Sequence, residues 1–481
     1  MKILPAALLL AFLIASCSNQ KAPEPFGPVP SDRQLEWHKM EYYMFAHFTV
    51  NTFTGREWGL GDEPEDVFNP SSLDCRQWAR VARDAGMKGI IITAKHHDGF
   101  CLWPSEYTTH SVKSSKWKDG KGDVVRELAE ACSEYGLKLG IYLSPWDRNN
   151  SSYAKPEYLN YYRNQLRELL TKYGNVFEVW FDGANGGDGY YGGAREMRRI
   201  DNRTYYDWPN THSIVRELQP GAVMFSDAGP DIRWVGNESG LGSPTNWCLL
   251  NRDTMYPGGD FASILGEGHP DGKYWVPAEV DVSIRPGWFW HESEDSLVKT
   301  PEKLMELWYA SVGRNCNLLL NVPPDRRGLL NEKDVDALMA FRKLRENEFK
   351  TELAKGRKCE ATSERGRKFR ATNLNDGDYE TYWSTPDNVR SASVTIILDK
   401  DTPVNRISIR EYIKLGQRVE KYTVEALSGG KWINVTEGTT IGNHVIRKFP
   451  LTEASAIRIN FEKSKACPVI SEIELYRAPG E

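Results

Sequence analysis

Two acidic residues, Asp182 and Glu238, occupy positions from which a carboxyl group could act on a bound substrate. Asp182 follows the apolar, β-branched stretch 176–181, which predicts a strand buried on both faces, and Gly183 comes directly after it. Because burying an unpaired charge is costly, the aspartate is expected to face a pocket where the strand ends. Capping of the next helix is the alternative interpretation.

Glu238 lies in the segment 233–240, close to Trp234. Apolar neighbours raise the pKa of a carboxyl group and keep it protonated, as a general acid must be. Two carboxyl groups on either side of a glycosidic bond can cleave it, since one attacks carbon or activates water while the other protonates the departing oxygen. An exposed glutamate that makes only a surface contact is the other interpretation.

Strand-like and helix-like segments alternate through the first half of the chain, which is typical of a parallel α/β fold. Later strands are expected at 278–284 and 317–322, followed by a closing helix at 331–346. The earlier strands are predicted at 42–50, 89–93, 137–143, 176–181 and 222–226, and the helices at 75–85, 123–135, 156–173 and 212–218.

Polar and aromatic residues follow several of these strands at their carboxyl ends, namely His47, His96, His97, Tyr142 and Asp182. In a (β/α)₈ (TIM) barrel those ends converge on one mouth, where the active site lies. A doubly wound open sheet would more often carry a Gly-rich phosphate loop after its first strand, and the sequence has none. We therefore predict an α/β chain with a (β/α)₈-like barrel over residues 34–350.

The pattern changes to short alternating strands beyond residue 350. Even spacing with Gly, Asn and Asp turns predicts a β-sandwich over residues 351–481. The predicted strands are 393–398, 406–410, 422–427, 456–461 and 470–476.

The N-terminus is typical of an export signal, because it has a basic start and an apolar run that is short for a membrane-spanning helix. The run Ile14-Ala15-Ser16-Cys17 resembles a bacterial lipobox, so Cys17 is expected to carry a lipid anchor, with an ordinary signal peptide as the alternative. Residues 1–17 would be the lipoprotein signal and the Pro-rich residues 18–33 a tether. The expected location is the periplasm or outer membrane of a Gram-negative bacterium.

The overall composition narrows the class of partner. A net charge of −5 without long charged runs argues against nucleic acid. The 16 Trp and 22 Tyr suit sugar binding, although aromatic residues equally fill cores. The cysteines are scattered and argue against a structural zinc site, while Cys359 and Cys467 bracket the C-terminal domain and are the two that could pair.

Residues 34–342 resemble glycoside hydrolase family 29, the retaining α-L-fucosidases. The matching motifs are His47-Phe48, Glu57-Trp58-Gly59, Lys95-His96-His97-Asp98-Gly99-Phe100, Tyr142 and Trp180-Phe181-Asp182-Gly183. The resemblance implies that Asp182 is the nucleophile that forms a glycosyl-enzyme intermediate. It also implies a sugar pocket lined by His47, Glu57, Trp58, His96, His97, Tyr142 and Trp180, and fucosylated oligosaccharides as substrates.

The general acid is the variable part of the family, because two subgroups place it differently. Gly236-Asn237-Glu238-Ser239-Gly240 looks like the subgroup restricted to α-1,3/1,4-fucosides of Lewis-type glycans. We favour Glu238 over Glu279 and Glu292, because we expect its loop to follow directly the strand next to that of Asp182. A retaining pair must lie only ~5–5.5 Å apart. Residues Arg285, Trp288 and Trp290 are expected either to shape the leaving-sugar side or to pack the loop.

Residues 371–384 resemble the signature of the discoidin (coagulation factor V/VIII type C) module. Such modules often bind sugars and hold a structural calcium through oxygens of this loop, so a calcium ion is expected in the C-terminal domain. The alternative is a turn-rich loop that only packs the module on the barrel.

The adjacent His96 and His97 raise a metal site as a rival interpretation. Neighbouring residues of a strand point to opposite faces, so two adjacent histidines seldom bind one ion, and sugar hydroxyls are the favoured ligands. We therefore predict an exported α-L-fucosidase that needs no metal for catalysis. The alternatives are a catalytically inactive sugar-binding lipoprotein and a metal-dependent hydrolase.

Overall fold

Eight parallel strands close into a barrel in the computed structural model, which describes residues 21–479. The predicted signal and Cys17 lie outside the described residues. The barrel strands are β1 (Tyr42–Ala46), β2 (Gly89–Lys95), β3 (Lys138–Leu143), β4 (Val176–Trp180), β7 (Val223–Ser226), β8 (Ile232–Trp234), β11 (Ala278–Ser283) and β12 (Asn317–Asn321). Their order around the barrel is β1-β12-β11-β8-β7-β4-β3-β2, which confirms the predicted fold class.

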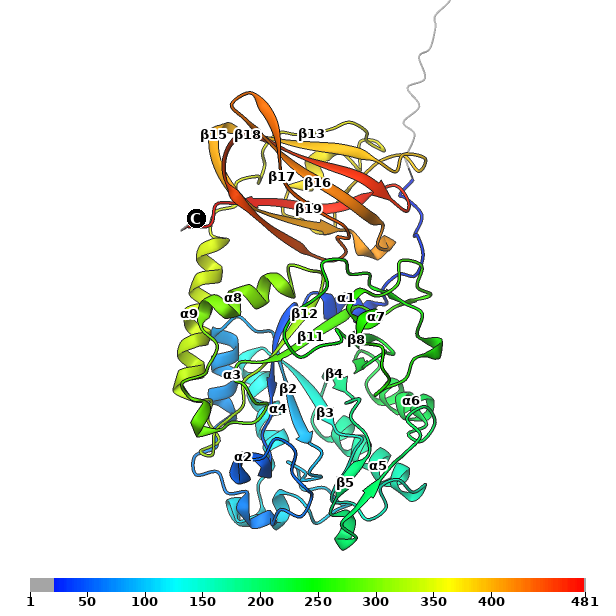
Figure 1. Cartoon of the computed structure of the whole chain (residues 1–481), viewed down its shortest axis with the longest axis vertical. Helices are drawn as coiled ribbons and strands as arrows, with labels where there is room; N and C mark the ends of the chain where they lie inside the picture. Colours follow the sequence, from blue (N-terminus) through cyan, green and yellow to red (C-terminus); the bar gives the residue numbers. More distant parts are fainter. Residues whose placement is uncertain (1–20, 480–481) are drawn as a thin grey trace, which may run out of the picture.

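Helices cover the outside of the barrel (Figure 1). They are α1 (Asp32–His38), α3 (Cys75–Asp84), α4 (Val124–Tyr135), α5 (Glu157–Lys172), α6 (Trp208–Leu218), α8 (Pro301–Ala310) and α9 (Glu332–Glu348). Asp123 caps α4 by accepting a hydrogen bond from the amide of Arg126, and Gly136 ends it in the left-handed conformation. The buried faces of α3 and α4 pack on β2 and β3, as their apolar spacing predicts.

One barrel strand, β8, is absent from the predicted set. It holds only three residues, and its central residue is Arg233, whose side chain is fully buried. The guanidinium donates to the carbonyls of Leu265 and Val276 and to the side chain of Asn246, so its charge is solvated by the protein itself. A short strand with an arginine at its centre does not match the apolar pattern of a buried strand.

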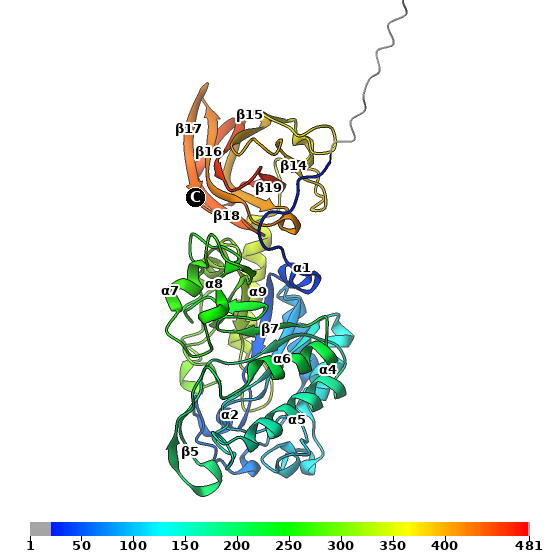
Figure 2. The ribbon, with the colours of Figure 1, turned by 90° about the vertical axis from the view of Figure 1, so that its right-hand side faces the viewer.

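The C-terminal domain is an antiparallel sheet stacked on the barrel (Figures 1 and 2). Its strand order is β14-β19-β15-β18-β16-β17, with β13 paired to β15. The predicted strands 393–398 and 406–410 are joined in the single long strand β15, across a register shift between Ile397 and Thr402. The bounds are β13 (Cys359–Ala361), β14 (Trp383–Ser384), β15 (Ala392–Glu411), β16 (Val419–Ser428), β17 (Lys431–Gly438), β18 (Val445–Ser464) and β19 (Val469–Tyr476).

Cys359 and Cys467 do not pair, because both are free thiols in the structure. Cys359 lies in β13 opposite Ile396, whereas Cys467 contacts the guanidinium of Arg418, 3.2 Å from its sulfur. The two cysteines therefore lie in different parts of the C-terminal domain and contact different neighbours.

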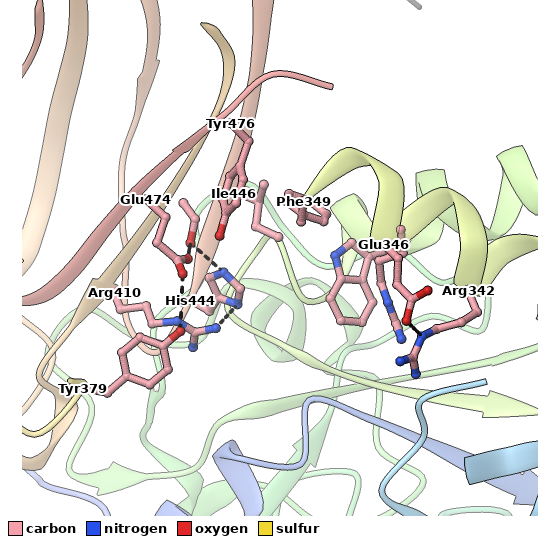
Figure 3. A pocket seen from close by; sticks show the side chains of 12 residues that line it. Arg342, Glu346, Phe349, Tyr379, Arg410, His444, Ile446, Glu474 and Tyr476 are labelled. Carbon is pink, nitrogen blue, oxygen red and sulfur yellow. Dashed lines mark hydrogen bonds and ion pairs between the residues drawn. The ribbon is translucent and has the colours of Figure 1, made fainter. Parts of the chain in front are cut away.

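A hydrogen-bonded chain joins the two domains beside a cavity of about 440 Å³ (Figure 3). Arg410 of β15 donates to Glu41, the residue before β1, at 2.8 Å, and His444 contacts the same carboxylate oxygen at 3.0 Å. Ser408 continues the chain by donating to Glu474 at 2.7 Å. These contacts fix the sheet against the amino-terminal end of the barrel, opposite the mouth at which β2 and β3 end.

The described part of the predicted tether begins at residue 21 and contacts the C-terminal domain. The amide of Phe26 donates to the carbonyl of Leu415 at 3.0 Å, and Arg418 donates to the carbonyl of Glu24. Within residues 21–479, no helix is long and apolar enough to cross a membrane.

Candidate active site

A cavity of about 100 Å³ lies at the carboxyl ends of the barrel strands and gathers nearly all predicted site residues. Of these, Glu57 alone is outside its lining. The predicted residues that line it are His47, Trp58, His96, His97, Tyr142, Trp180, Asp182 and Glu238. Residues from strands far apart in the sequence thus meet at one mouth, as the barrel topology requires.

Asp182 follows β4 directly and is held by two donors. Its Oδ2 accepts a hydrogen bond from the hydroxyl of Tyr142 at 3.0 Å, and its Oδ1 accepts one from the amide of Ala184 at 2.6 Å. Burial raises the pKa of Asp182, while both donors favour the carboxylate and lower it. The next residue must be small, because a Cβ added to Gly183 would lie 2.2 Å from a carboxylate oxygen of Asp227.

Glu238 lies across the cavity, in the loop between β8 and β9 (Leu249–Leu250). Its Oε2 accepts a hydrogen bond from the indole of Trp288 at 3.3 Å. Burial raises the pKa of Glu238, and the nearby Asp182 and Glu57 raise it further. The indole donor Trp288 lowers the pKa of Glu238, so the rise comes from burial and the two carboxylates; Trp234 does not contact Glu238 in this way, because its indole donates to Asp281.

The position of the Glu238 loop corrects one prediction. We expected this loop to follow the strand next to that of Asp182. The neighbour of β4 in the barrel is β7, however, and the loop follows β8, which is one strand further around. The Glu238 loop still reaches the cavity, because it leaves the carboxyl end of β8 and faces the same mouth.

Trp180 forms the floor of the cavity. Its ring stacks on Phe225 with centroids 4.0 Å apart and lies 5.3 Å from the ring of Tyr142. The indole donates to Glu279 at 2.8 Å, so Glu279 lies in the barrel core behind this floor and is fully buried. Neither Glu279 nor Glu292, the two rival acids, lines the cavity.

The three pocket histidines are buried and neutral. Burial lowers the pKa of His47 and of His97 to about 3, and it lowers that of His96 as well. His47 contacts the side chain of Asn321 at 2.8 Å, and His97 contacts the hydroxyl of Ser144 at 2.7 Å. A neutral imidazole with one nitrogen fixed in this way offers its other nitrogen to a sugar hydroxyl.

Glu57 differs from its predicted role, because it supports a loop instead of lining the cavity. Its carboxylate accepts hydrogen bonds from the amides of Trp288 at 2.7 Å and Phe289 at 3.3 Å, and it contacts His291 at 2.6 Å. Glu57 thereby positions Trp288, which in turn contacts Glu238. The neighbouring Trp58 does line the cavity and is 53% exposed.

Of the three residues considered for the leaving-sugar side, Trp288 alone lines the cavity. Arg285 is buried and bonded to Asp334 and Asp295, so it anchors the loop to α9. Trp290 is 8% exposed and belongs to the loop packing.

The cavity also contains functional candidates that the sequence patterns did not single out, Phe45, Ala184 and Asp281. Alternation along β11 was the available signal for Asp281, because residues 279, 281 and 283 of one strand share a face. Within the described range 21–479, no group of three or more His, Cys, Asp and Glu side chains could hold a metal ion.

A parallel barrel whose mouth brings together three carboxyl groups, neutral histidines and an indole floor fits the architecture of a glycoside hydrolase, which needs two carboxyl groups at the bond that it cleaves. The chain belongs to the α-L-fucosidase family, glycoside hydrolase family 29: the family model "Alpha-L-fucosidase" matches residues 25–344. A second model, "F5/8 type C domain", matches residues 358–473. The protein is thus an α-L-fucosidase with a C-terminal discoidin-like domain.

Relatives match over nearly the whole chain. Alpha-L-fucosidase 1 of Arabidopsis thaliana is 43% identical over 461 residues, covering 94% of this chain and 88% of its own. A glycoside hydrolase 29 family member from a rumen bacterium has a TM-score of 0.86 and 47% identity, covering 95% of this chain and 79% of its own. A Ruminococcus gnavus GH29 fucosidase, solved in complex with fucose, has a TM-score of 0.85 and 32% identity, covering 96% of this chain and 97% of its own.

Proposed function

We propose that this α-L-fucosidase is a retaining exo-enzyme that releases terminal L-fucose from α-1,3/1,4-linked, Lewis-type glycans. The observation that carries the proposal is the meeting of Asp182 and Glu238 in one small cavity with the indole floor of Trp180. A cavity of about 100 Å³ suits a single terminal sugar, because binding sites for larger ligands typically enclose roughly 300–1,000 Å³.

Asp182 acts as the nucleophile in this proposal. Its carboxylate attacks the anomeric carbon of fucose, and a covalent glycosyl-enzyme ester forms as the glycosidic C–O bond breaks. The hydrogen bonds from Tyr142 and Ala184 stabilise the carboxylate form and oppose the rise in pKa that burial causes.

Glu238 acts as the general acid and then as the general base. Its raised pKa retains the proton that the departing sugar oxygen takes up in the first step. In the second step the resulting carboxylate removes a proton from water, which hydrolyses the ester and restores the acid. Neutral His47, His96 and His97 bind the hydroxyls, and Trp58 and Trp180 cover the apolar face of fucose.

A product profile tests the linkage. Lewis a and Lewis x trisaccharides should yield free fucose with and without EDTA, whereas an α-1,2-linked H-type trisaccharide should be cleaved far more slowly. Preference for the α-1,2 linkage would contradict the proposed specificity. Sugar binding without turnover would support the inactive-lipoprotein alternative, and loss of activity in EDTA would support the metal-dependent one.

We propose a structural calcium at the loop that begins at Asp376 in the C-terminal domain. Glu472 presents a buried Oε2 that has no hydrogen-bond partner among residues 21–479, and burial together with Glu474 and Asp376 raises its pKa to about 8. The second oxygen of Asp376 accepts a hydrogen bond from Thr381 at 2.8 Å. Glu472 and Asp376 are only two carboxylates, so the ion would take its other ligands from hydroxyl and backbone carbonyl oxygens, which calcium also accepts.

Calcium is expected to raise the unfolding temperature of the protein and EDTA to lower it. A ligand at 100 times its Kd stabilises a domain by about 2.7 kcal/mol. Differential scanning fluorimetry measures the shift, and Glu472→Gln should abolish the response to calcium while fucosidase activity persists. An identical calcium response in Glu472→Gln and in the unaltered protein would exclude this site.

We propose that the enzyme is exported and anchored through a lipid on Cys17. The proposal is supported by the lipobox-like run and by the packing of Phe26 and Glu24 on the C-terminal domain. Since the seven residue steps from Cys17 to Glu24 span at most ~25 Å, the anchor would hold that domain close to the membrane. Labelling with a radioactive fatty acid, with Cys17→Ser as control, tests the anchor, and an unlabelled wild-type protein would refute it.

A further inference from the structure

Asp281 is a third carboxyl group in the sugar cavity, and the chemistry described above does not use it. It lies near the carboxyl end of β11 and is 3% exposed, and it lines the same cavity as Asp182 and Glu238. A buried carboxyl group that faces a binding pocket is uncommon without a partner or a function.

The geometry of β11 separates Asp281 from Glu279. Residues 279 and 281 share a face of the strand, and each step along a strand is about 3.3 Å. Glu279 is occupied behind the floor by the indole of Trp180 and the hydroxyl of Tyr43. Asp281 lies two residues nearer the carboxyl end of the strand and lines the cavity, whereas Glu279 does not.

The surroundings of Asp281 favour its protonated form. Its Oδ1 accepts a hydrogen bond from Trp234 of β8 at 2.9 Å, and this contact alone would lower the pKa of Asp281, but burial and the neighbouring charges outweigh it. The charged groups that face it are acidic, namely Glu238 from the loop after β8 and Glu279 from its own strand. Burial raises the pKa of Asp281 well above its usual range, and the two glutamates raise it further.

We propose that Asp281 acts as a neutral carboxylic acid that donates a hydrogen bond to bound fucose on the Glu238 side of the pocket. The proposal rests on the proposed function, because it takes fucose as the ligand. A neutral acid can approach the sugar without repelling the carboxylate of Asp182, whereas an ionised Asp281 would place a second negative charge in a very small cavity.

The main rival is a structural role, in which Asp281 serves only to hold the indole of Trp234. The isosteric variant Asp281→Asn separates the two. Its amide keeps an oxygen for Trp234 and supplies a neutral N–H donor toward the sugar. Asp281→Ala removes both the oxygen that accepts from Trp234 and the donor toward the sugar. The donor role predicts that fucose binding is lost in Asp281→Ala and kept in Asp281→Asn.

Fucose affinity is best measured by calorimetry in the Asp182→Ala background, where no turnover occurs, from about pH 5 to about pH 9. Asp281→Ala should weaken binding about tenfold, the usual cost of a lost buried hydrogen bond. Asp281→Asn should bind within about threefold of the parent. The parent should lose affinity as pH rises and Asp281 ionises, whereas Asp281→Asn should lose less.

Several outcomes would overturn the role of Asp281. Unchanged affinity in Asp281→Ala would show that the carboxyl does not touch fucose, and equal loss in Asp281→Asn would show that the ionised form is needed. Asp123→Ala is a control that removes the cap of α4, and since Asp123 does not line the cavity it should lower the unfolding temperature without changing fucose affinity.

A measurement on the unaltered protein keeps the proposal testable if the variants do not fold. Difference infrared spectroscopy should show a protonated carboxyl band that shifts when fucose binds at neutral pH, and a band that does not respond to fucose would count against the donor. Failure of the Asp182→Ala parent to bind fucose at any pH would overturn the proposed fucose site itself, which is a different result from failed rescue by asparagine.

Discussion

Asp182→Ala should lower turnover of a fucoside by about 10⁴-fold or more, because the covalent route needs a carboxylate at the anomeric carbon. The cavity otherwise keeps its lining, so the affinity for fucose and the unfolding temperature should change little. Initial rates on an aryl α-L-fucoside, together with calorimetric binding of fucose, measure both quantities. The loss should appear almost entirely in kcat.

Near-wild-type turnover in Asp182→Ala would remove this residue as nucleophile. The contact network makes a useful control, because Tyr142→Phe deletes the hydroxyl that donates to Asp182 but leaves the carboxylate in place. This variant should retain far more activity than Asp182→Ala and should show a raised pKa on the acidic limb of its pH profile, since the carboxylate loses a stabilising donor.

Glu238→Ala should reduce turnover of natural glycans by about 10²–10⁴-fold, because the departing sugar oxygen then leaves without a proton. A substrate with a good leaving group needs less protonation, so its first step should be affected less. Added azide should partly restore release of the sugar as fucosyl azide, since the small anion can attack the intermediate without a general base.

The pH profile offers a second test of Glu238. Because its pKa is raised, Glu238 keeps its proton to a higher pH than an ordinary glutamate does, and the acid form is lost as pH rises through that pKa. The unaltered enzyme should therefore lose activity on the alkaline side, and much of this limb should disappear in Glu238→Ala. Glu292→Ala is a matched control, since Glu292 does not line the cavity and its loss should leave the rates near wild type. Azide rescue of Glu279→Ala instead would assign the acid to Glu279.

The barrel was predictable because its strands are apolar runs that end in unusual polar residues. The strand of Asp182 is the clearest case, since residues 176–181 are apolar apart from Glu178 and lead straight into Asp182 and Gly183. That pattern repeats at His96, His97 and Tyr142, and parallel topology alone then brings these residues to one mouth.

The remaining errors have physical causes. Strand β8 escaped prediction because Arg233 is buried in its centre, and local patterns do not show that distant carbonyls will solvate a guanidinium. Glu57 was expected to line the sugar pocket, but its contacts to Trp288 and His291 join segments more than 200 residues apart. Asp281 was overlooked because its importance depends on which strands flank β11, and only the closed barrel defines them.

Trapping the intermediate tests the central claim most directly. Incubation with 2-deoxy-2-fluoro-fucosyl fluoride slows hydrolysis of the ester, so digestion and mass spectrometry can locate the labelled residue. Our account predicts one fluorofucosyl group on the peptide that contains Asp182, and faster accumulation when Glu238 is replaced by alanine. A label on Asp281 or Glu279, or active hydrolysis with inversion and no label, would contradict it.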